Sequence, residues 1–551
     1  MFTYRSWPSI HLDSGKYALH LLLVGIGILG FLENEAQARC SGVIVLSGND
    51  TEVQRILDAH GPGTVFCFEP GKCHFANPIS PKERQVLISI EKGKAVLDGS
   101  VRVSGFVVSG QNWVVAVPDS LISTVPDPAA RAVCQTYYES YDTSCNFSKS
   151  LYFDDRMFLR VLDLSQLDYG KYYEDPATNQ IYLRDDPAGH IVEVAVAPFI
   201  IQVCQPGNPH CSNDVEIIGF VVQKAANPSG WGAVDAEGTA GWLFKNNEVR
   251  FNHGTGVVID GSTIEDNYIH HNGQLGLSGS CAPSSDLTAC FPNSSHNVRI
   301  LNNEIAHNNT LNFSAQDEAG GGKWAATYGL LVRGNYVHDN RGPGLWCDIT
   351  CFKAVFECNT LNHNILQKTA PFNGDGLGGG IIYEVSNKAI IRYNTFIDND
   401  PDPKLGNDGL LLAAGIIVSA SSGVDAYGNL VIGLNGIGVD MTSSSFDSNG
   451  TGLGRIDWCG TPPNNQYPDG SLFCTGLNSE NRPIHEVLGN RFHNNVVLEK
   501  GGSVGGTGRD HRQLRAEILL VGLRTLLQQS LLLARSKSRD LLSVVRSAGK
   551  L

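Results

Sequence analysis

The phrase Asn335-Tyr336-Val337-His338-Asp339-Asn340, followed by Gly344-Leu345-Trp346-Cys347-Asp348, contains the pattern that decides the fold. Its Asn-x4-Asn frame recurs along the middle of the chain, at Asn247…Asn252, Asn267…Asn272, Asn303…Asn308, Asn359…Asn364 and Asn394…Asn399. An apolar residue stands three positions before and two positions after each first asparagine. Internal repetition of this kind indicates a solenoid, in which each repeat forms one rung and neighbouring rungs stack.

The composition favours an all-β chain with many turns. The chain of 551 residues contains 61 glycines, and only 17% of its residues are charged. A solenoid can reach this length as one unit, so the length does not require several globular domains. The net charge of −14 argues against a nucleic-acid partner, because phosphate binding needs clustered lysine and arginine.

Residues 1–38 are predicted to be an export signal. An apolar run over residues 19–29 follows Arg5 and Lys16, and Ala36-Gln37-Ala38 offers a cleavage site of small residues. The run is short for a membrane-spanning helix, which needs about 20 residues. We therefore expect cleavage, a secreted protein (extracellular or periplasmic) and no stable membrane insertion. An uncleaved anchor is the alternative.

Fourteen cysteines in an exported chain indicate disulfide bonds. Several pairs lie close enough in sequence to pin loops between rungs: Cys67/Cys73, Cys134/Cys145, Cys204/Cys211, Cys281/Cys290 and Cys459/Cys474. The triplet Cys347, Cys351 and Cys358 has no assigned pairing. Because the sequence holds no CxxC doublet, structural bridges are preferred over a metal site.

A short amphipathic helix is predicted over residues 50–59, with Asp50 as its N-cap. It leads into Pro62-Gly63-Thr64-Val65-Phe66, the start of an alternating strand, and then to Ala95-Val96-Leu97-Asp98-Gly99-Ser100, a strand that ends in a turn. A solenoid exposes its core at an open end and needs a cap there. The helix would supply that cap.

Together, the helix, the Pro-Gly-Thr-Val-Phe strand, the Leu-Asp-Gly-Ser turn and the asparagine repeats resemble the right-handed parallel β-helix family. This superfamily includes pectate and alginate lyases, polygalacturonases and mannuronan epimerases. The resemblance covers residues 40–100 and 214–500 approximately, and implies a polysaccharide partner bound along an outer parallel sheet. It selects no single activity, because many chemistries share this scaffold.

The predicted organisation follows from these segments. Residues 39–100 hold the N-terminal cap and first rung, residues 206–502 the β-helix repeats, and residues 503–551 a basic helix-like tail without an assigned role. Residues 101–205 interrupt the repeat, and the strand-turn-strand pattern of residues 172–183 predicts an inserted small antiparallel β module. A set of long decorated loops is the alternative. We expect a monomer.

The second half of the opening phrase differs between repeats and predicts a site. If Leu345 points into the core, Trp346 and Asp348 point outward together, because alternate strand residues face opposite sides. The same register places Glu384 outward on the next rung, about 4.8 Å away. Counting back from the asparagine frame sets Lys323 beside Asp348.

An outer face that bears lysine, two carboxylates and two tryptophans would suit a sugar, since aromatic rings cover the apolar faces of pyranoses. We therefore predict Trp324 and Trp346 as substrate-binding residues. Lys323, Asp348 and Glu384 are the predicted catalytic residues.

Two mechanisms fit this set. In β-elimination, Lys323 takes the proton next to a uronate carboxylate, and Ca²⁺ held by Glu318, Asp348 or Glu384 neutralises that carboxylate. In hydrolysis, Asp348 and Glu384 act as general acid and base. One-rung neighbours lie near the roughly 5 Å of retaining enzymes, unlike the inverting polygalacturonases of the superfamily, whose paired-Asp motif is not found here.

A uronate polysaccharide lyase is thus the preferred interpretation. A glycoside hydrolase or an epimerase on the same scaffold is one alternative. The other is a non-catalytic carbohydrate-binding or surface-structural solenoid, in which the column of charges is a solvated ion-pair ladder.

Three other files receive structural interpretations. The asparagines are expected to stack and to satisfy turn backbone groups. Ion pairing across rungs is expected for Lys245, Glu265, Arg333, Glu357 and Arg392. Histidines recur at two outward positions, as His270, His338 and His493 and as His271, His307 and His363. Their spacing is compatible with a transition metal, but a hydrated surface row is preferred.

Overall fold

A computed structural model of the protein describes residues 40–122, 143–204, 211–280, 297–315, 318–365, 377–399, 412–433 and 437–440, together with short segments between 454 and 499. The export signal predicted for residues 1–38 and the basic tail predicted for residues 503–551 lie outside the described residues. So do Cys134, Cys281, Cys290 and Cys459.

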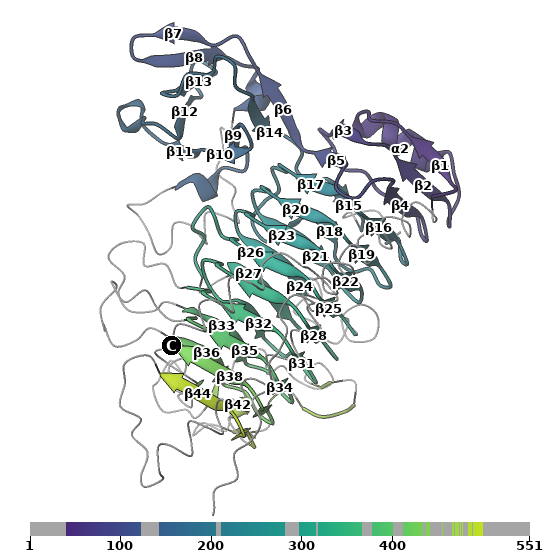
Figure 1. Ribbon diagram of the computed structural model, residues 1–551, viewed down its shortest axis with the longest axis vertical. Helices are drawn as coiled ribbons and strands as arrows, with labels where there is room; N and C mark the ends of the chain where they lie inside the picture. The colour runs from purple at the N-terminus through teal and green to yellow at the C-terminus, as the bar shows by residue number, and fades with distance from the viewer. Residues whose placement is uncertain are drawn as a thin grey trace, which may run out of the picture.

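Three long parallel sheets, which we call sheets A, B and C, run along the molecule as the chain passes from rung to rung (Figure 1). Each complete rung adds one strand to every sheet. Neighbouring strands pair in register, so that Val332 lies opposite Phe356 in sheet A and Val337 lies opposite Leu361 in sheet B. The predicted all-β parallel solenoid is confirmed.

Sheet A consists of β1 (Val43–Val45), β2 (Val65–Phe68), β4 (Val86–Ser89), β16 (Glu216–Ile218), β19 (Leu243–Lys245), β22 (Thr263–Glu265), β25 (Arg299–Leu301), β28 (Leu331–Arg333), β31 (Val355–Glu357), β34 (Ile390–Arg392), β37 (Asp425–Tyr427) and β43 (Arg491–His493). Sheet B consists of β3 (Gly71–His74), β5 (Ala95–Asp98), β17 (Val221–Gln223), β20 (Glu248–Arg250), β23 (Tyr268–His270), β26 (Glu304–Ala306), β29 (Tyr336–His338), β32 (Thr360–Asn362), β35 (Thr395–Ile397), β38 (Leu430–Gly433) and β44 (Val496–Glu499). Sheet C consists of β15 (Ile201–Gln202), β18 (Gly232–Ala236), β21 (Thr255–Ile259), β24 (Leu275–Ser280), β27 (Gly320–Ala325), β30 (Leu345–Asp348), β33 (Leu377–Glu384), β36 (Leu412–Ser419) and β39 (Ile437–Asp440).

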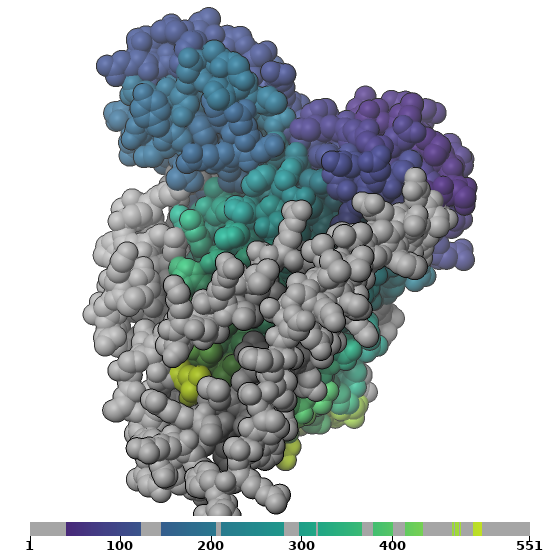
Figure 2. Space-filling view, viewed as in Figure 1, coloured from purple at the N-terminus to yellow at the C-terminus, as the bar shows by residue number. Residues whose placement is uncertain are grey.

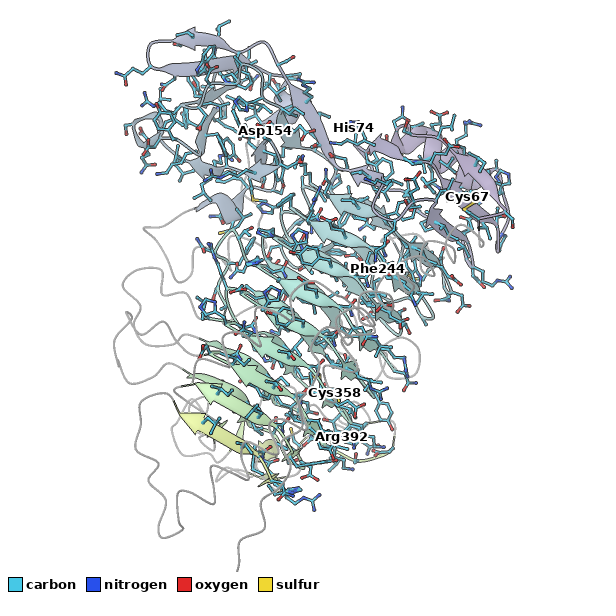
Figure 3. All side chains as sticks on the ribbon, viewed as in Figure 1. Cys67, His74, Asp154, Phe244, Cys358 and Arg392 are labelled. Carbon is cyan, nitrogen blue, oxygen red and sulfur yellow. A yellow bond between two sulfur atoms is a disulfide. The ribbon has the colours of Figure 1, made fainter. Side chains whose placement is uncertain are left out.

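The core of the solenoid is a continuous stack of apolar side chains. The positions flanking each first asparagine point inward, and Val332, Val337 and Leu345 are fully buried. Phe244, labelled in Figure 3, belongs to the same core. Each such side chain contributes about 1.5–3 kcal/mol by leaving water, so the repeating apolar pattern is the main stabilising term of the rungs.

The asparagine frames form two buried hydrogen-bonded ladders. Asn335 Oδ1 accepts from the backbone N–H of Asn303 at 2.8 Å, while its Nδ2 donates to Ile300 O and to Asn359 Oδ1, both at 2.9 Å. Asn340 repeats this pattern one turn later in the rung, donating to Ile305 O at 2.9 Å. Each side chain therefore satisfies backbone groups that the turns leave unpaired, as expected from the sequence.

One helix, α2 (Asp50–Asp58), lies at the start of the solenoid beside β1 and β2 (Figure 1). Its buried residues Val53 and Leu57 join the solenoid core, which makes it the predicted cap. The predicted N-cap is wrong by one residue, because Asn49 accepts from the N–H of Glu52 at 2.9 Å. No helix within the described ranges is long and apolar enough to cross a membrane.

The segment between β5 and β15 forms a separate lobe above the solenoid (Figure 2). One of its sheets holds β6 (Ser100–Val103), β9 (Leu151–Phe153), β10 (Arg156–Met157) and β14 (Val192–Ala195). The other holds β7 (Val107–Ser109), β8 (Asn112–Ala116), β11 (Leu159–Val161), β12 (Lys171–Asp175) and β13 (Gln180–Leu183). All pairings are antiparallel except that of β11 with β12. The lobe has its own apolar core and is the inserted β module.

A buried charge network joins the module to the first rungs. The ammonium group of Lys224, which follows β17, binds Glu193 of β14 and Asp155 of the β9–β10 turn. The Lys224 side chain is fully buried. Asp98 lies in the same network, where it binds Lys72 at 2.9 Å and accepts from Gln223 Nε2 at 2.6 Å.

The structure contains the disulfides Cys40–Cys67, Cys204–Cys211 and Cys347–Cys351. Cys204–Cys211 was expected, and Cys347–Cys351 resolves part of the unassigned triplet. The predicted Cys67/Cys73 bridge is wrong, because the two residues lie in different sheets and Cys73 is a buried free thiol. Cys145 and Cys474 are also disulfide-bonded.

Candidate functional site

The predicted site lies on the outer face of sheet C. Leu345 points into the core, and Trp346 and Asp348 therefore face outward as expected. Lys323 of β27 lies directly opposite Trp346, and Ala325 lies opposite Asp348. Glu384, at the end of β33, faces outward on the next rung.

Lys323 is the centre of this group. Its Nζ atom lies 3.1 Å from Asp348 Oδ2 and 3.8 Å from Glu318 Oε1. The same atom lies 3.8 Å from the ring centroid of Trp346, which is cation–π geometry. The side chains of Lys323 and Asp348 are each only 9% exposed, so this ion pair is shielded from water.

The electrostatics of the pair keep Lys323 protonated. Burial acts to lower its pKa, but the charges of Asp348, Glu318 and Glu384 outweigh burial, and the net effect raises the pKa above the ordinary value. This direction does not favour the base predicted from the sequence, because a base must first release its proton. It suits a fixed positive charge that faces an anionic substrate group.

Trp324 is not part of the site. It pairs with Cys347 in the strand register, and its side chain is fully buried in the solenoid core. The prediction that Trp324 binds substrate is wrong, since a one-residue shift in register exchanges the inner and outer faces of a strand. The turn after β27 is one residue shorter than the turn after β30, and counting back from the asparagine frame missed this difference.

Trp346 lies on the outer face but is only 3% exposed, where it packs beside Ile382 and Ile417. Its indole Nε1 is buried, and no described residue accepts a hydrogen bond from it. A buried donor without an acceptor is costly, and the indole of Trp324 in the solenoid core has the same unpaired donor.

The carboxylates predicted to hold calcium do not form a cation cage in this arrangement. The Lys323 ammonium lies between Asp348 and Glu318, where it supplies the positive charge that an ion would bring. Calcium takes six to eight oxygen ligands. The residues present do not fit that demand.

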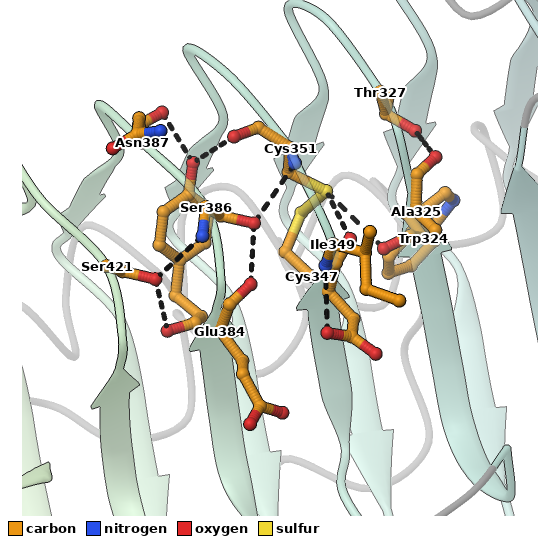
Figure 4. Close-up of a disulfide and its surroundings, with 12 residues drawn as sticks. Trp324, Ala325, Thr327, Cys347, Ile349, Cys351, Glu384, Ser386, Asn387 and Ser421 are labelled. Atoms are coloured by element: carbon orange, nitrogen blue, oxygen red, sulfur yellow. Dashed lines mark hydrogen bonds between the residues drawn. A yellow bond between two sulfur atoms is a disulfide. The ribbon is translucent and has the colours of Figure 1, made fainter. Parts of the chain in front are cut away.

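The turn that follows the two acids carries backbone strain. Ile349 and Val385, which come directly after Asp348 and Glu384, have φ values of 44° and 45°. β-branched residues rarely adopt this left-handed conformation, and such strain is often found at functional sites. The Cys347–Cys351 disulfide brackets the first of these turns (Figure 4).

Hydrogen bonds hold this turn to the next rung. Cys351 N donates to Ser386 Oγ at 3.0 Å, and Ser386 Oγ donates to Glu384 O at 2.7 Å (Figure 4). The backbone that carries Asp348 is therefore fixed relative to the backbone that carries Glu384.

A family model described as "Right handed beta helix region" matches residues 232–451. This part of the chain is a right-handed β-helix. The match includes Lys323, Trp346, Asp348 and Glu384, so the predicted site lies on the β-helix itself. No curated protein sequence is significantly similar to the chain.

Several solved structures align with the β-helix at low identity. A glycoside hydrolase is 12% identical, with 72% of this chain and 94% of that chain covered and a TM-score of 0.38. The A-module of a mannuronan C-5 epimerase from Azotobacter vinelandii is 13% identical (71% and 96% covered, TM-score 0.27). The surface adhesin PfbA of Streptococcus pneumoniae is 11% identical (84% and 93% covered, TM-score 0.30). The fold assignment itself rests on the strand register and the family match.

Two buried acids extend the polar part of the β-helix face beyond the predicted residues. Asp235 occupies the outward row that continues through Val258 and Ser278 to Lys323. Burial raises its pKa to about 6, against hydrogen bonds from Gly232 and Glu237 that lower it. Burial likewise raises the pKa of Asp260 well above the ordinary value. The sequence analysis did not identify Asp235 as part of this face, because the rung of β18 lacks the asparagine frame.

Proposed function

We propose that the protein is a secreted β-helix enzyme that acts on an extracellular polysaccharide by β-elimination at a uronate residue. The observation that supports the proposal most directly is the shielded Lys323–Asp348 pair on the outer face of sheet C, with the Trp346 ring against the ammonium group. Charged groups withdrawn from water on an outward face are costly, and such groups are typical of functional sites. The disulfides accord with export.

In the proposed reaction, the Lys323 ammonium faces the uronate carboxylate and neutralises it. Glu384, half-buried on the neighbouring rung, takes the proton from the carbon next to that carboxylate. The bond to the leaving glycosidic oxygen breaks, and a carbon–carbon double bond forms. The leaving oxygen takes up a proton from water, and Glu384 releases the abstracted proton to solvent. Asp348 holds Lys323 in position through the 3.1 Å contact.

The test is formation of the unsaturated product, followed by ultraviolet absorbance, on a panel of uronate polymers. Glu384→Gln should lower the rate by 100-fold or more, since a general base contributes about 10²–10⁴-fold. Lys323→Met should also lower it by about 100-fold or more, since it removes the charge that neutralises the carboxylate. Lys353→Met is the matched control, because this lysine is 44% exposed and pairs with Asp469, which is not part of the Lys323 group. Unchanged rates in both site variants would refute the proposal.

A non-catalytic carbohydrate-binding solenoid is the second candidate. The burial that shields Lys323 and Trp346 favours it, because a structural ion pair needs no access to substrate. Binding of a uronate oligosaccharide without any unsaturated product, together with its loss in Lys323→Met, would support this function instead.

A further inference from the structure

A second cluster of chemistry-bearing side chains lies on sheet B and on the turn from sheet B to sheet C. His271, His307, Asp339 and His363 follow one another on successive rungs, at the fourth position after the first asparagine of each frame. All four have φ between 52° and 55°. Because these residues share the same left-handed turn conformation, their side chains lie in one column along the solenoid.

His338 completes the cluster from the adjacent position of β29. His307, His338 and Asp339 each offer one ligand atom, and these three atoms lie within 4.8 Å of one another. Ligand nitrogen and oxygen atoms bind zinc at about 2.0–2.2 Å. Only small side-chain adjustments are therefore needed for all three to reach one ion.

The surrounding contacts orient these ligands. His363 Nδ1 lies 2.7 Å from Asp339 Oδ1, and His338 Nδ1 lies 2.7 Å from Asp339 Oδ2. On its other side, His338 Nε2 lies 3.5 Å from Glu304 Oε1. A carboxylate that accepts a hydrogen bond from the far nitrogen of a metal-binding histidine fixes the ring and raises its basicity. Glu304 is in this position relative to His338.

We propose that His307, His338 and Asp339 bind one divalent first-row transition-metal ion, of which zinc is the best fit. Two imidazoles and one carboxylate bind such ions in preference to calcium or magnesium. Three protein ligands leave coordination positions open for water or for an anionic or hydroxyl group. This site is independent of the function proposed for sheet C.

His493 provides a control from another part of the fold. The sequence groups it with His338, but His493 lies on β43 of sheet A, opposite Tyr427 of β37, whereas His338 lies on β29 of sheet B. Its side chain is 47% exposed and pairs with Asp425, also of sheet A. His493 is thus a solenoid histidine outside the three-ligand set.

The experiment uses chelator-treated full-length protein and titrates Zn²⁺ alone by calorimetry, with Co²⁺ as a spectroscopic probe. We expect one equivalent of Zn²⁺ to bind, and visible Co²⁺ absorption to report nitrogen ligation. His307→Ala and Asp339→Asn should weaken Zn²⁺ binding by at least 100-fold, and His363→Ala by about 10-fold. His493→Ala should bind as the unaltered protein does.

Circular dichroism of the metal-free variants separates loss of ligand from loss of fold. If one variant unfolds, His338→Gln and His363→Ala still test the site, since a hydrated surface row predicts no difference between them and His493→Ala. Absence of Zn²⁺ binding at micromolar concentrations, or equal affinity in the His307, Asp339 and His493 variants, would overturn the proposal.

Discussion

The Nζ atom of Lys323 lies 3.1 Å from Oδ2 of Asp348, although these residues are not opposite each other in sheet C. Lys323 lies opposite Trp346, and its side chain reaches diagonally across the strand pair to the carboxylate. The contact therefore depends on the aromatic ring beneath the lysine as well as on the two charges.

We predict that removing one charge of this pair destabilises the protein more than replacing both charged residues with apolar ones. Asp348→Asn leaves a buried ammonium without its main counter-charge and should lower the free energy of unfolding by about 3–5 kcal/mol. The double variant Lys323→Met with Asp348→Leu should stay within about 1 kcal/mol of the unaltered protein, since apolar replacement of a buried pair is often neutral. Urea unfolding of the three proteins measures both differences. A double variant that is no more stable than Asp348→Asn would contradict this prediction.

The asparagine ladder predicts a position-dependent cost. Asn335→Ala removes a fully buried side chain that serves two neighbouring rungs, and should destabilise by about 2–4 kcal/mol because each orphaned buried group costs about 1–3 kcal/mol. Asn495→Ala, at the half-buried end of the same ladder, should cost about 1 kcal/mol. Equal losses in thermal or urea unfolding would show that the ladder is not the cause.

Asp235 predicts that stability falls as pH rises. Its folded-state pKa of about 6 exceeds the ordinary 3.8, so between these pH values the folded state binds more protons than the unfolded state. The contribution of protonated Asp235 to the free energy of unfolding is therefore lost as the pH rises through 6. Asp235→Asn should therefore be more stable than the unaltered protein at pH 7.5, by about 3 kcal/mol at most. The difference should disappear near pH 4. Urea unfolding at the two pH values checks this prediction, and a constant difference would refute it.

The column of ion pairs on sheet A predicts a loss of stability that depends on salt concentration. Glu357 lies between Arg333 and Arg392, with ion-pair distances of 2.5 Å and 2.6 Å. Glu357→Gln removes the negative charge between two arginines that lie on the flanking rungs, and should cost about 1–2 kcal/mol at low ionic strength, an effect that salt reduces by screening. Melting temperatures measured with and without added salt test it. A loss that salt does not change would point to packing instead.

The sequence was sufficient to predict the fold because each rung repeats the same asparagine and apolar positions. Hydrogen bonding and burial at Asn335 and Val337 are local to the repeat, and so follow from it. The site was less predictable, because it depends on the lengths of the turns between sheets C and A. One residue fewer after β27 moved Trp324 into the core, while Lys323 remained on the outer face.

The same limit applies to the disulfides. Sequence proximity correctly paired Cys204 with Cys211, whose bridge closes one short loop. It failed for Cys67, whose partner Cys40 is 27 residues away and comes close only because β1 and β2 lie side by side. Proximity along a solenoid is set by rungs, not by residue count.

The buried network at Lys224 has a mechanical consequence. Since the fully buried Lys224 ammonium binds Asp155 and Glu193 of the module, rotation of the module against the first rungs would have to leave that charge unpaired. The ion pairs thus resist such a rotation. A polymer or protein that pulls on the module would transmit its load into the solenoid through these ion pairs.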